Sequence, residues 1–189
     1  MDRDHYALTE YNVPLIENRA DPYIFKHEDG TYYFTASVPE YDRIILRKAA
    51  AISGLKYAEE KTLWVRHDSG PMSCHIWAPE IHYISGAWYI YFAAGEKDDI
   101  WKIRPYVLVN RGDPMEDEWE ELGQMKAAET PEPDKFSFQD FSLDMTVFPY
   151  REKWYCVWAE KVNIGKKISN LYIAEMEAPD RLLTAQVLL

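Results

Sequence analysis

The sequence has only two cysteines and no hydrophobic run long enough to cross a membrane. Cys74 and Cys156 are far apart and belong to no Cys-x-x-Cys or Cys/His cluster, which argues against a disulfide framework and a structural zinc site. No stretch approaches the roughly 18 uninterrupted apolar residues of a membrane span. The segment Met1–His5 also lacks the basic-then-apolar layout of a secretory signal. We therefore expect reduced thiols, no membrane association and a cytoplasmic protein.

Basic residues are in deficit. The chain has 21 Lys and Arg against 32 Asp and Glu, which gives a formal net charge of −11. Such a charge repels phosphate backbones and anionic lipid surfaces. The sequence therefore predicts that nucleic acid is not a partner.

Aromatic residues are abundant, at 15% of the 189 residues, and many stand in a repeated pattern. Three stretches share one layout: a short strand that opens with an acid or a proline, a turn, and an aromatic strand that ends in small residues. They cover residues 21–37, 79–94 and 144–159. The turns at Gly30 and Gly86 are hairpin signals, because glycine adopts a positive φ at little cost. Most of the aromatics are expected to be structural, since strands and cores favour them.

Each hairpin is followed by a third strand and a weaker fourth, so the repeating unit is four antiparallel strands. This unit is typical of the blades of a β-propeller. We predict an all-β fold with about three four-stranded blades. The predicted domain is a single partial propeller that covers residues 1–189. Its blades are predicted at residues 20–66, 75–122 and 140–189.

A β-sandwich is the alternative all-β fold, and the repeat favours the propeller. Three blades do not close a ring, because propellers typically have about four to eight. Either the remaining blades lie in sequence that is not present, or chains associate. Between the second and third blades, residues 124–142 are predicted to form a long loop, the kind of segment that often carries binding residues.

Two aspartates stand at corresponding places in the first and third repeats. Asp21 and Asp144 each lie four residues before a phenylalanine, and the first strand of a propeller blade begins at the funnel where ligands bind. Two converging carboxylates suit glycoside hydrolysis, in which one group activates water and another protonates the leaving oxygen. Asp21 has a structural alternative as a strand-entry residue before proline. Asp144 has apolar neighbours, so an unpaired carboxylate there indicates function.

Three motifs, each at the start of a predicted blade, resemble family 43 of the glycoside hydrolases. They are Arg-Ala-Asp-Pro-Tyr-Ile at 19–24, His-Ile-Trp-Ala-Pro-Glu-Ile at 75–81 and Ser-Leu-Asp-Met-Thr-Val-Phe at 142–148. The second and third are the more specific, and the resemblance spans nearly the whole chain. It implies the first three blades of a five-bladed propeller that hydrolyses arabinofuranosides, xylosides or arabinan with inversion.

The resemblance also implies roles for the two aspartates. Asp21 resembles the general base that activates water, and Asp144 resembles the residue that orients the acid and tunes its strength. The family's general acid, a glutamate of the fourth blade, has no counterpart before Leu189. General acid catalysis typically contributes about 10²–10⁴-fold, so we expect the isolated chain to have little or no activity. Family members often hold an ion through the final blade, and we expect neither a tightly held metal nor a cofactor here.

Several other residues near the motifs are candidates for function. We expect Glu80 to be hydrogen-bonded between blades and Glu160 to be solvated at a strand end, so neither replaces the acid. His75 and His82 lack a carboxylate at ligand spacing and are expected to be structural histidines rather than metal ligands. The candidates for substrate binding are Trp77, His75, Phe34 and Arg43. Trp77 is either a platform for a sugar ring or part of the core between blades, and Phe34 and Arg43 are placed at the funnel rim.

The sequence therefore predicts a glycoside hydrolase, or part of one, acting on oligosaccharides that contain arabinose or xylose. Two alternatives stay open: a propeller fragment that binds carbohydrate without catalysis, and a fragment that forms a homo-oligomer or is completed by a separate C-terminal chain. The choice between arabinose and xylose, and between endo and exo action, depends on loop shape.

Overall fold

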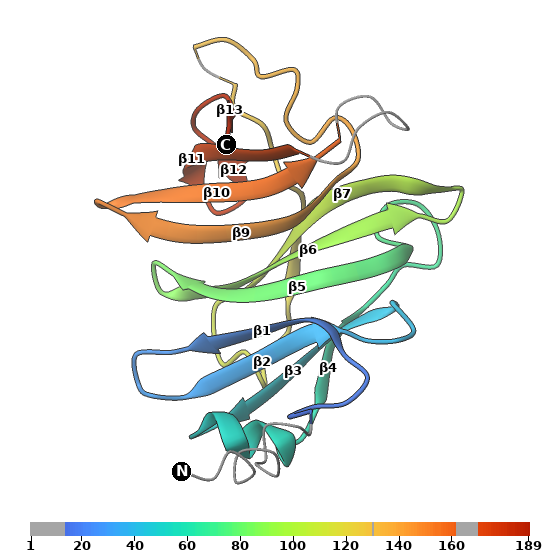
Figure 1. Ribbon diagram of the computed structural model, residues 1–189, viewed down its shortest axis with the longest axis vertical. Coiled ribbons are helices and arrows are strands. Elements are labelled where there is room, and N and C mark those ends of the chain that lie inside the picture. Colours follow the sequence, from blue (N-terminus) through green and yellow to red (C-terminus); the bar gives the residue numbers. More distant parts are fainter. Residues whose placement is uncertain (1–13, 130, 162–169) are drawn as a thin grey trace, which may run out of the picture.

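Nearly all the regular structure of this protein is β-strand. The computed structural model describes residues 14–129, 131–161 and 170–189, so the segment Met1–His5 lies outside the described residues. The strands form three antiparallel sheets that follow one another along the chain (Figure 1). A short 3-10 helix, η3 (Ile52–Lys56), precedes the last strand of the first sheet. In the described ranges no helix is long and apolar enough to cross a membrane. The all-β prediction is confirmed.

Each sheet is built from strands that are consecutive in sequence. The first sheet has the order β1-β2-β3-β4, with β1 at Ala20–Lys26, β2 at Tyr32–Ser37, β3 at Arg43–Ala49 and β4 at Lys61–Val65. The second has the order β5-β6-β7-β8, with β5 at Cys74–Ile84, β6 at Ala87–Glu96, β7 at Asp99–Asn110 and β8 at Glu120–Gln124. The third has the order β12-β11-β10-β9, and β13 also pairs with β11. Its strands are β9 at Ser142–Tyr150, β10 at Lys153–Glu160, β11 at Asn170–Ala178, β12 at Arg181–Leu182 and β13 at Val187–Leu188.

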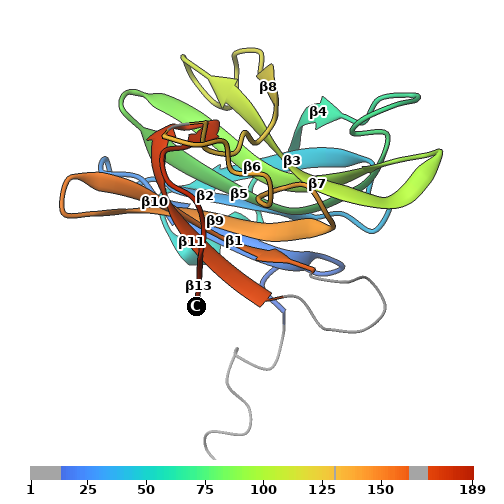
Figure 2. The same ribbon diagram turned by 90° about the horizontal axis from the view of Figure 1, so that it is seen from above.

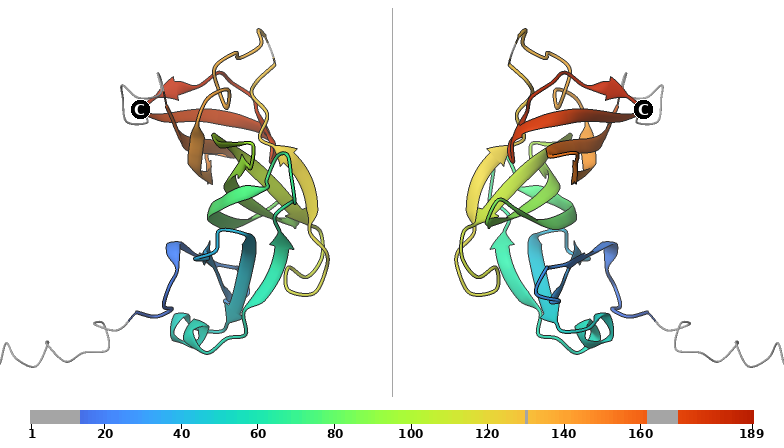
Figure 3. Two further views of the ribbon diagram at one scale, coloured as in Figure 1. Left: turned by 90° about the vertical axis from the view of Figure 1, so that its right-hand side faces the viewer. Right: turned by 90° about the vertical axis from the view of Figure 1, so that its left-hand side faces the viewer.

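The three sheets are stacked in chain order. The strands β1 and β2 contact β5, and β6 and β7 contact β9. Figure 1 shows the first sheet at the bottom and the third at the top, and two side views show the same succession (Figure 3). Seen from above, the sheets overlap (Figure 2). The strands β1, β5 and β9 run in the same direction across the molecule (Figure 1), so their first residues lie on one side of the stack.

Apolar side chains fill the space between the sheets. Ile44, Ile81 and Phe92 belong to the cluster between the first and second sheets. Tyr91 and Trp158 are fully buried in the cluster between the second and third. Burying one large apolar side chain stabilises the fold by about 1.5–3 kcal/mol. These contacts fix the sheets against one another and thereby fix the relative positions of the first strands.

The hairpin of β6 and β7 is longer than the sequence predicted. The aromatic and apolar pattern indicated strands at 88–94 and 106–109, whereas pairing continues to the contact between Glu96 and Asp99. The added part of β7 is largely exposed, so it lacks the apolar pattern by which a strand is recognised. After β8, the described residues between 125 and 141 contain no strand, in agreement with the predicted loop.

Candidate active site

Asp21 begins the site, at the start of β1. Its backbone has a φ of 48°, and its carboxylate is exposed to solvent. The buried hydroxyl of Ser37, at the end of β2, donates a hydrogen bond of 3.1 Å to Asp21 Oδ2. The same hydroxyl accepts a bond of 2.7 Å from the backbone N–H of Ala78 in β5. Ser37 therefore links the carboxylate of the first sheet to the backbone of the second.

Asp144 lies at the start of β9 in the third sheet and is also exposed. Packing around the carboxyl group removes part of its water and raises its pKa, and the negative charges of Asp21 and Glu80 raise it further. A charge acts on a pKa in this way only from nearby. The carboxylates of Asp21 in the first sheet and Glu80, midway along β5 in the second, therefore lie near Asp144 in the third.

Glu80, the carboxylate from the second sheet, is fixed by a neighbour in its own strand. Its Oε2 lies 3.0 Å from Nε2 of His82, which is almost fully buried. The imidazole packs against the rings of Tyr23 and Tyr91, with centroids 5.2 and 5.7 Å away. The partner of Glu80 is thus in β5 and not in another sheet, which corrects the expected bond between blades.

Backbone strain is concentrated at this end of the sheets. Besides Asp21, the residues His75, Ala78 and Asp144 have φ values of 54°, 46° and 51°. Residues other than glycine adopt this left-handed region infrequently, at a cost of about 1–3 kcal/mol each. Strain of this kind clusters at functional sites, so its position supports the site that the carboxylates define.

Trp77 and His75 lie near the start of β5, just before Ala78, whose N–H is bonded to Ser37. Trp77 packs partly against Ala93, Ile103 and Phe141, and its ring lies 4.4 Å from that of His75 at an interplanar angle of 34°. Burial lowers the pKa of His75, and its Nε2 is shielded from water without a hydrogen-bond partner. His75 is therefore not the satisfied structural histidine that the sequence suggested, whereas His82 fits that description.

The other two predicted binding residues differ in their surroundings. Phe34 is 3% exposed and packs with Ile45 and Leu55 in a core cluster of the first sheet. Its ring has no surface to offer a sugar, which corrects its placement at the rim. Arg43 is partly exposed and pairs with Asp42 at 2.7 Å and with Glu40 at 3.2 Å.

Glu160, expected to be solvated, is fully buried. Its carboxylate accepts bonds from Trp158 Nε1 at 2.8 Å and from the backbone N–H groups of Phe138 and Asp140 at 3.0 and 3.2 Å. Burial raises its pKa, and these hydrogen bonds oppose that effect. The segment preceding β9 folds over the end of β10 and removes Glu160 from solvent, so it anchors a loop and does not line the site.

The side chains of the site do not fit a metal ion. In the part of the chain that the structure describes, no three His, Cys, Asp or Glu residues are grouped as metal ligands are. No step of the reaction is therefore assigned to an ion held by these residues.

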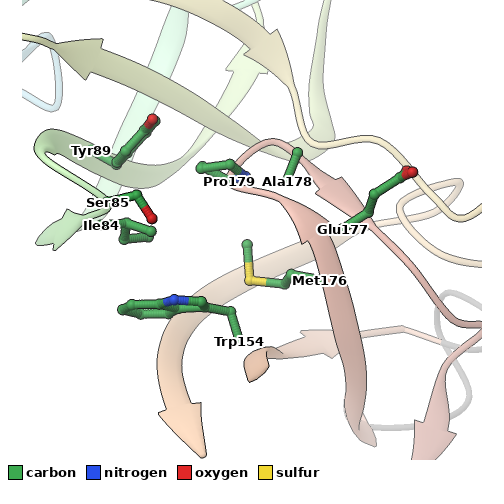
Figure 4. Close-up of a pocket in the computed structure, with 8 residues that line it drawn as sticks. All are labelled: Ile84, Ser85, Tyr89, Trp154, Met176, Glu177, Ala178 and Pro179. Carbon is green, nitrogen blue, oxygen red and sulfur yellow. The ribbon is translucent and has the colours of Figure 1, made fainter. Parts of the chain in front are cut away.

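A separate pocket lies at the other end of the strands, where β5 turns into β6. It has a volume of about 200 Å³ and is lined by Ile84, Ser85, Tyr89, Trp154 and Met176, among others. Figure 4 shows the Trp154 ring on one side and Tyr89 and Ser85 across from it. It contains none of the three clustered carboxylates, so it is distinct from the candidate site.

Sequence reasoning missed Ser37 and Trp101. Ser37 ends an ordinary aromatic strand, and only its bonds to the first and second sheets show its role. Trp101 lies in the part of β7 that was not predicted as strand, 60% exposed beside His75. A tryptophan within a polar, non-periodic segment was the available signal.

Carboxylates that gather on strained backbone have the chemistry of a hydrolase that works by acid–base catalysis. The family model for "Glycosyl hydrolases family 43" matches residues 11–189, and the chain belongs to this family. It is 49% identical to an extracellular exo-α-(1→5)-L-arabinofuranosidase of Streptomyces avermitilis over 170 residues, covering 89% of this chain and 34% of that protein. The protein with the same description from Streptomyces chartreusis is 44% identical over 178 residues, covering 94% and 52%.

Solved structures of other proteins also resemble this chain. The crystal structure of an α-L-arabinofuranosidase from Lactobacillus brevis matches with a TM-score of 0.82 at 46% identity, over 93% of this chain and 55% of that one. A thermostable family 43 glycoside hydrolase matches with a TM-score of 0.65 at 18% identity, over 90% and 52%, which supports the fold alone. The chain thus spans about a third to a half of these proteins.

The comparisons contradict the expected cytoplasmic location, because both Streptomyces relatives are named extracellular enzymes. That expectation rested on Met1–His5, and the first residues of a sequence that covers part of its relatives carry no evidence about a leader. The family resemblance read from the three motifs is confirmed.

Proposed function

We propose that this chain is part of an α-L-arabinofuranosidase and that its three sheets are the blades of a partial propeller, near residues 20–66, 75–122 and 140–189. Asp21 acts as the general base and Asp144 as the modulator of the acid. The observation that carries the proposal is the convergence of exposed Asp21 and Asp144 from sheets far apart in sequence, close enough for one charge to act on the other.

The geometry around Asp21 suits a base. Ser37 occupies Oδ2 with a hydrogen bond, which orients the carboxylate and leaves Oδ1 to accept a proton from water. The water then attacks the anomeric carbon from the face opposite the leaving oxygen, and a single displacement of this kind inverts the configuration. Asp144, with a raised pKa, is suited to share a proton with a neighbouring acid group.

No described residue is assigned as the proton donor to the leaving oxygen. Glu160 is buried under the loop before β9 and cannot reach a ligand. Glu80 lies near Asp144 but is paired with His82. Substrates whose leaving group departs without protonation are therefore the appropriate test for these 189 residues.

The substrate we propose is a terminal α-L-arabinofuranosyl unit rather than a xyloside. Two curated relatives are described as exo-α-(1→5)-L-arabinofuranosidases, and the Lactobacillus brevis structure is that of an α-L-arabinofuranosidase. Trp77 and His75 are the side chains we assign to sugar binding, with Arg43 at the edge of the site. Cys156 is compatible with the extracellular location of the relatives, since burial raises the pKa of its thiol and keeps it unreactive.

The test is hydrolysis of 4-nitrophenyl α-L-arabinofuranoside and 4-nitrophenyl β-D-xyloside by the full chain. Asp21→Asn keeps the size of the side chain and removes the base. Asp68→Asn, at an exposed loop residue, is the matched control. We expect release of nitrophenol from the arabinofuranoside, its loss in Asp21→Asn and its retention in Asp68→Asn.

Faster release from the xyloside would overturn the choice of arabinose. Release that survives Asp21→Asn would overturn the role of Asp21. If neither substrate is cleaved while arabinose still binds, the chain is a binding module and the hydrolase proposal fails for it.

A further inference from the structure

The pocket where β5 turns into β6 is built from two sheets. The second sheet and its β5–β6 turn contribute Ile84, Ser85 and Tyr89, and the third sheet contributes Trp154 and Met176. Along β5, Ile84 is the sixth residue after Ala78, a span of about 20 Å in an extended strand. Because Ala78 is the residue that Ser37 joins to Asp21, the pocket and the proposed base lie at opposite ends of the strand.

The walls of the pocket are held by the fold itself. The hydroxyl of Tyr91, which is fully buried, donates a hydrogen bond of 2.8 Å to the carbonyl of Pro179. The next carbonyl, that of Asp180, accepts the backbone N–H of Lys126 at 2.9 Å. Trp154 packs against the core cluster between the second and third sheets. A ligand therefore meets a shape that is already formed, which lowers the entropy cost of binding it.

The lining combines an aromatic wall with a hydroxyl. Trp154 is partly exposed and forms one wall, and the exposed Ser85 directs its hydroxyl toward that side (Figure 4). The carboxylate of Glu177 points away from Trp154 (Figure 4). An indole ring offers a flat apolar surface to the C–H face of a sugar ring, and a serine hydroxyl can donate to or accept from a sugar hydroxyl. The side chains around Trp154 thus suit an uncharged saccharide.

Size and charge narrow the ligand further. The volume of about 200 Å³ is below the roughly 300–1,000 Å³ that sites for drug-sized ligands occupy, so the pocket has room for one small ring. A net charge of −11 disfavours an anionic ligand. A single neutral pentose unit satisfies both limits.

We propose that this pocket is a second carbohydrate site, which holds one pentose unit of an arabinan chain at the end of the sheets opposite Asp21 and Asp144. The sugar ring stacks on Trp154, and one of its hydroxyls bonds Ser85. The site tethers the polymer to the protein and takes no part in hydrolysis. The choice of arabinan rests on the proposed function, whereas the site itself rests on the lining of the pocket.

The experiment follows the indole N–H resonance of Trp154 by NMR in the ¹⁵N-labelled full chain carrying Asp21→Asn, which prevents hydrolysis. The resonance is assigned with Trp154→Phe. Arabinose and α-1,5-linked arabinotriose should each shift it to saturation, and Trp77→Phe at the candidate active site should leave this titration unchanged. Ser85→Ala should weaken binding about tenfold, the size of one lost hydrogen bond. Ser53→Ala, at an exposed serine of η3, is the matched control and should have no effect.

A Trp154 resonance that neither sugar moves would overturn the inference. Cyclohexanol, which is apolar and of similar size, tests the alternative of a merely apolar pocket, and a shift as large as that caused by arabinose would also overturn the sugar site. Equal affinities in Ser85→Ala and Ser53→Ala would remove the role of Ser85. Exclusion of arabinotriose would overturn the tethering of a chain.

The nitrophenyl assay decides separately on the proposed function. Ser85→Ala should release nitrophenol at the unchanged rate, because its hydroxyl lies far from Asp21, and a loss of this activity would contradict a site that takes no part in hydrolysis. Matching far-ultraviolet circular dichroism establishes that the variants are folded.

Discussion

Ser37 Oγ donates a hydrogen bond to Asp21 Oδ2 across 3.1 Å and joins that carboxylate to the second sheet by accepting the N–H of Ala78 at 2.7 Å. Asp21 and Ala78 both have positive φ values. A single buried hydroxyl therefore holds two strained backbone positions together. The orientation of the proposed base depends on packing between the first and second sheets, not on β1 alone.

Ser37→Ala should lower the free energy of unfolding by about 1–3 kcal/mol, because it leaves the N–H of Ala78 without its acceptor. Urea unfolding followed by tryptophan fluorescence measures the change. Thr35 provides the control: it lies in the same strand, is fully buried, and its hydroxyl has no partner. Thr35→Val should therefore be neutral or stabilising. Equal costs for the two substitutions would mean that the bonds of Ser37 contribute nothing specific.

The charge coupling between Asp21 and Asp144 gives a prediction about titration. Burial is the main cause of the raised pKa of Asp144, and the charges of Asp21 and Glu80 add to it. Asp21→Asn removes one of these charges and should lower the pKa of Asp144. The side-chain carboxyl ¹³C resonance of Asp144, followed by NMR as a function of pH, measures the shift.

Asp68→Asn is the control for this titration as well, because it removes a charge from an exposed loop. It should leave the Asp144 titration where it was. An unchanged Asp144 pKa in Asp21→Asn would show that the two carboxylates are too far apart to share a site.

The sequence was sufficient to place the two aspartates, because their position follows from the repeat. Asp21 and Asp144 each stand at the start of the first strand of a sheet, and stacking of like sheets brings like positions together. The all-β class followed from the same repeat. Local pattern alone therefore identified the two aspartates on which the proposed site depends, and their catalytic roles stay predictions.

Burial at the ends of strands could not be predicted in this way. Glu160 ends β10, where a charged residue is ordinarily solvated, but the loop before β9 covers it. Phe34 lies in β2, which is paired on both sides and buried along nearly its whole length. Both outcomes depend on segments distant in sequence, and strand alternation carries no information about them.

The buried carboxylate of Glu160 supports the loop that leads to Asp144. Glu160→Ala should lower the free energy of unfolding by about 3–5 kcal/mol, because it leaves Trp158 Nε1 and the N–H groups of Phe138 and Asp140 without an acceptor. Glu160→Gln keeps one oxygen and should cost less than Glu160→Ala. Urea unfolding measures both.

Glu152→Ala, at an exposed position in the turn before β10, is the control and should change stability little. A small cost for Glu160→Ala would contradict the anchoring role. It would mean that the loop rearranges to let water reach the three donors.

Glu60 joins Arg19, which directly precedes β1, to Arg47 in β3. Arg19 Nη2 donates to Glu60 Oε1 at 2.6 Å and to Oε2 at 2.7 Å, and Arg47 Nε donates to Oε2 at 3.1 Å. Burial alone would raise the pKa of Glu60, but the bonds and charges of the two arginines outweigh it and lower that pKa. The folded protein therefore binds a proton at Glu60 less readily than the unfolded chain does.

A lowered pKa fixes the direction of the pH dependence. The stability that ionised Glu60 contributes is present above the unfolded pKa of about 4.3 and is lost as the pH falls through the folded value. Glu60→Gln should therefore lower the free energy of unfolding by about 1 kcal/mol at pH 7, after allowance for screening, and this difference should shrink as the pH falls from 5 to 3. Urea unfolding across this range measures it, with the exposed Glu59→Gln as the neighbouring control. A difference that persists unchanged at pH 3 would assign the stabilisation to packing of the side chain and not to its charge.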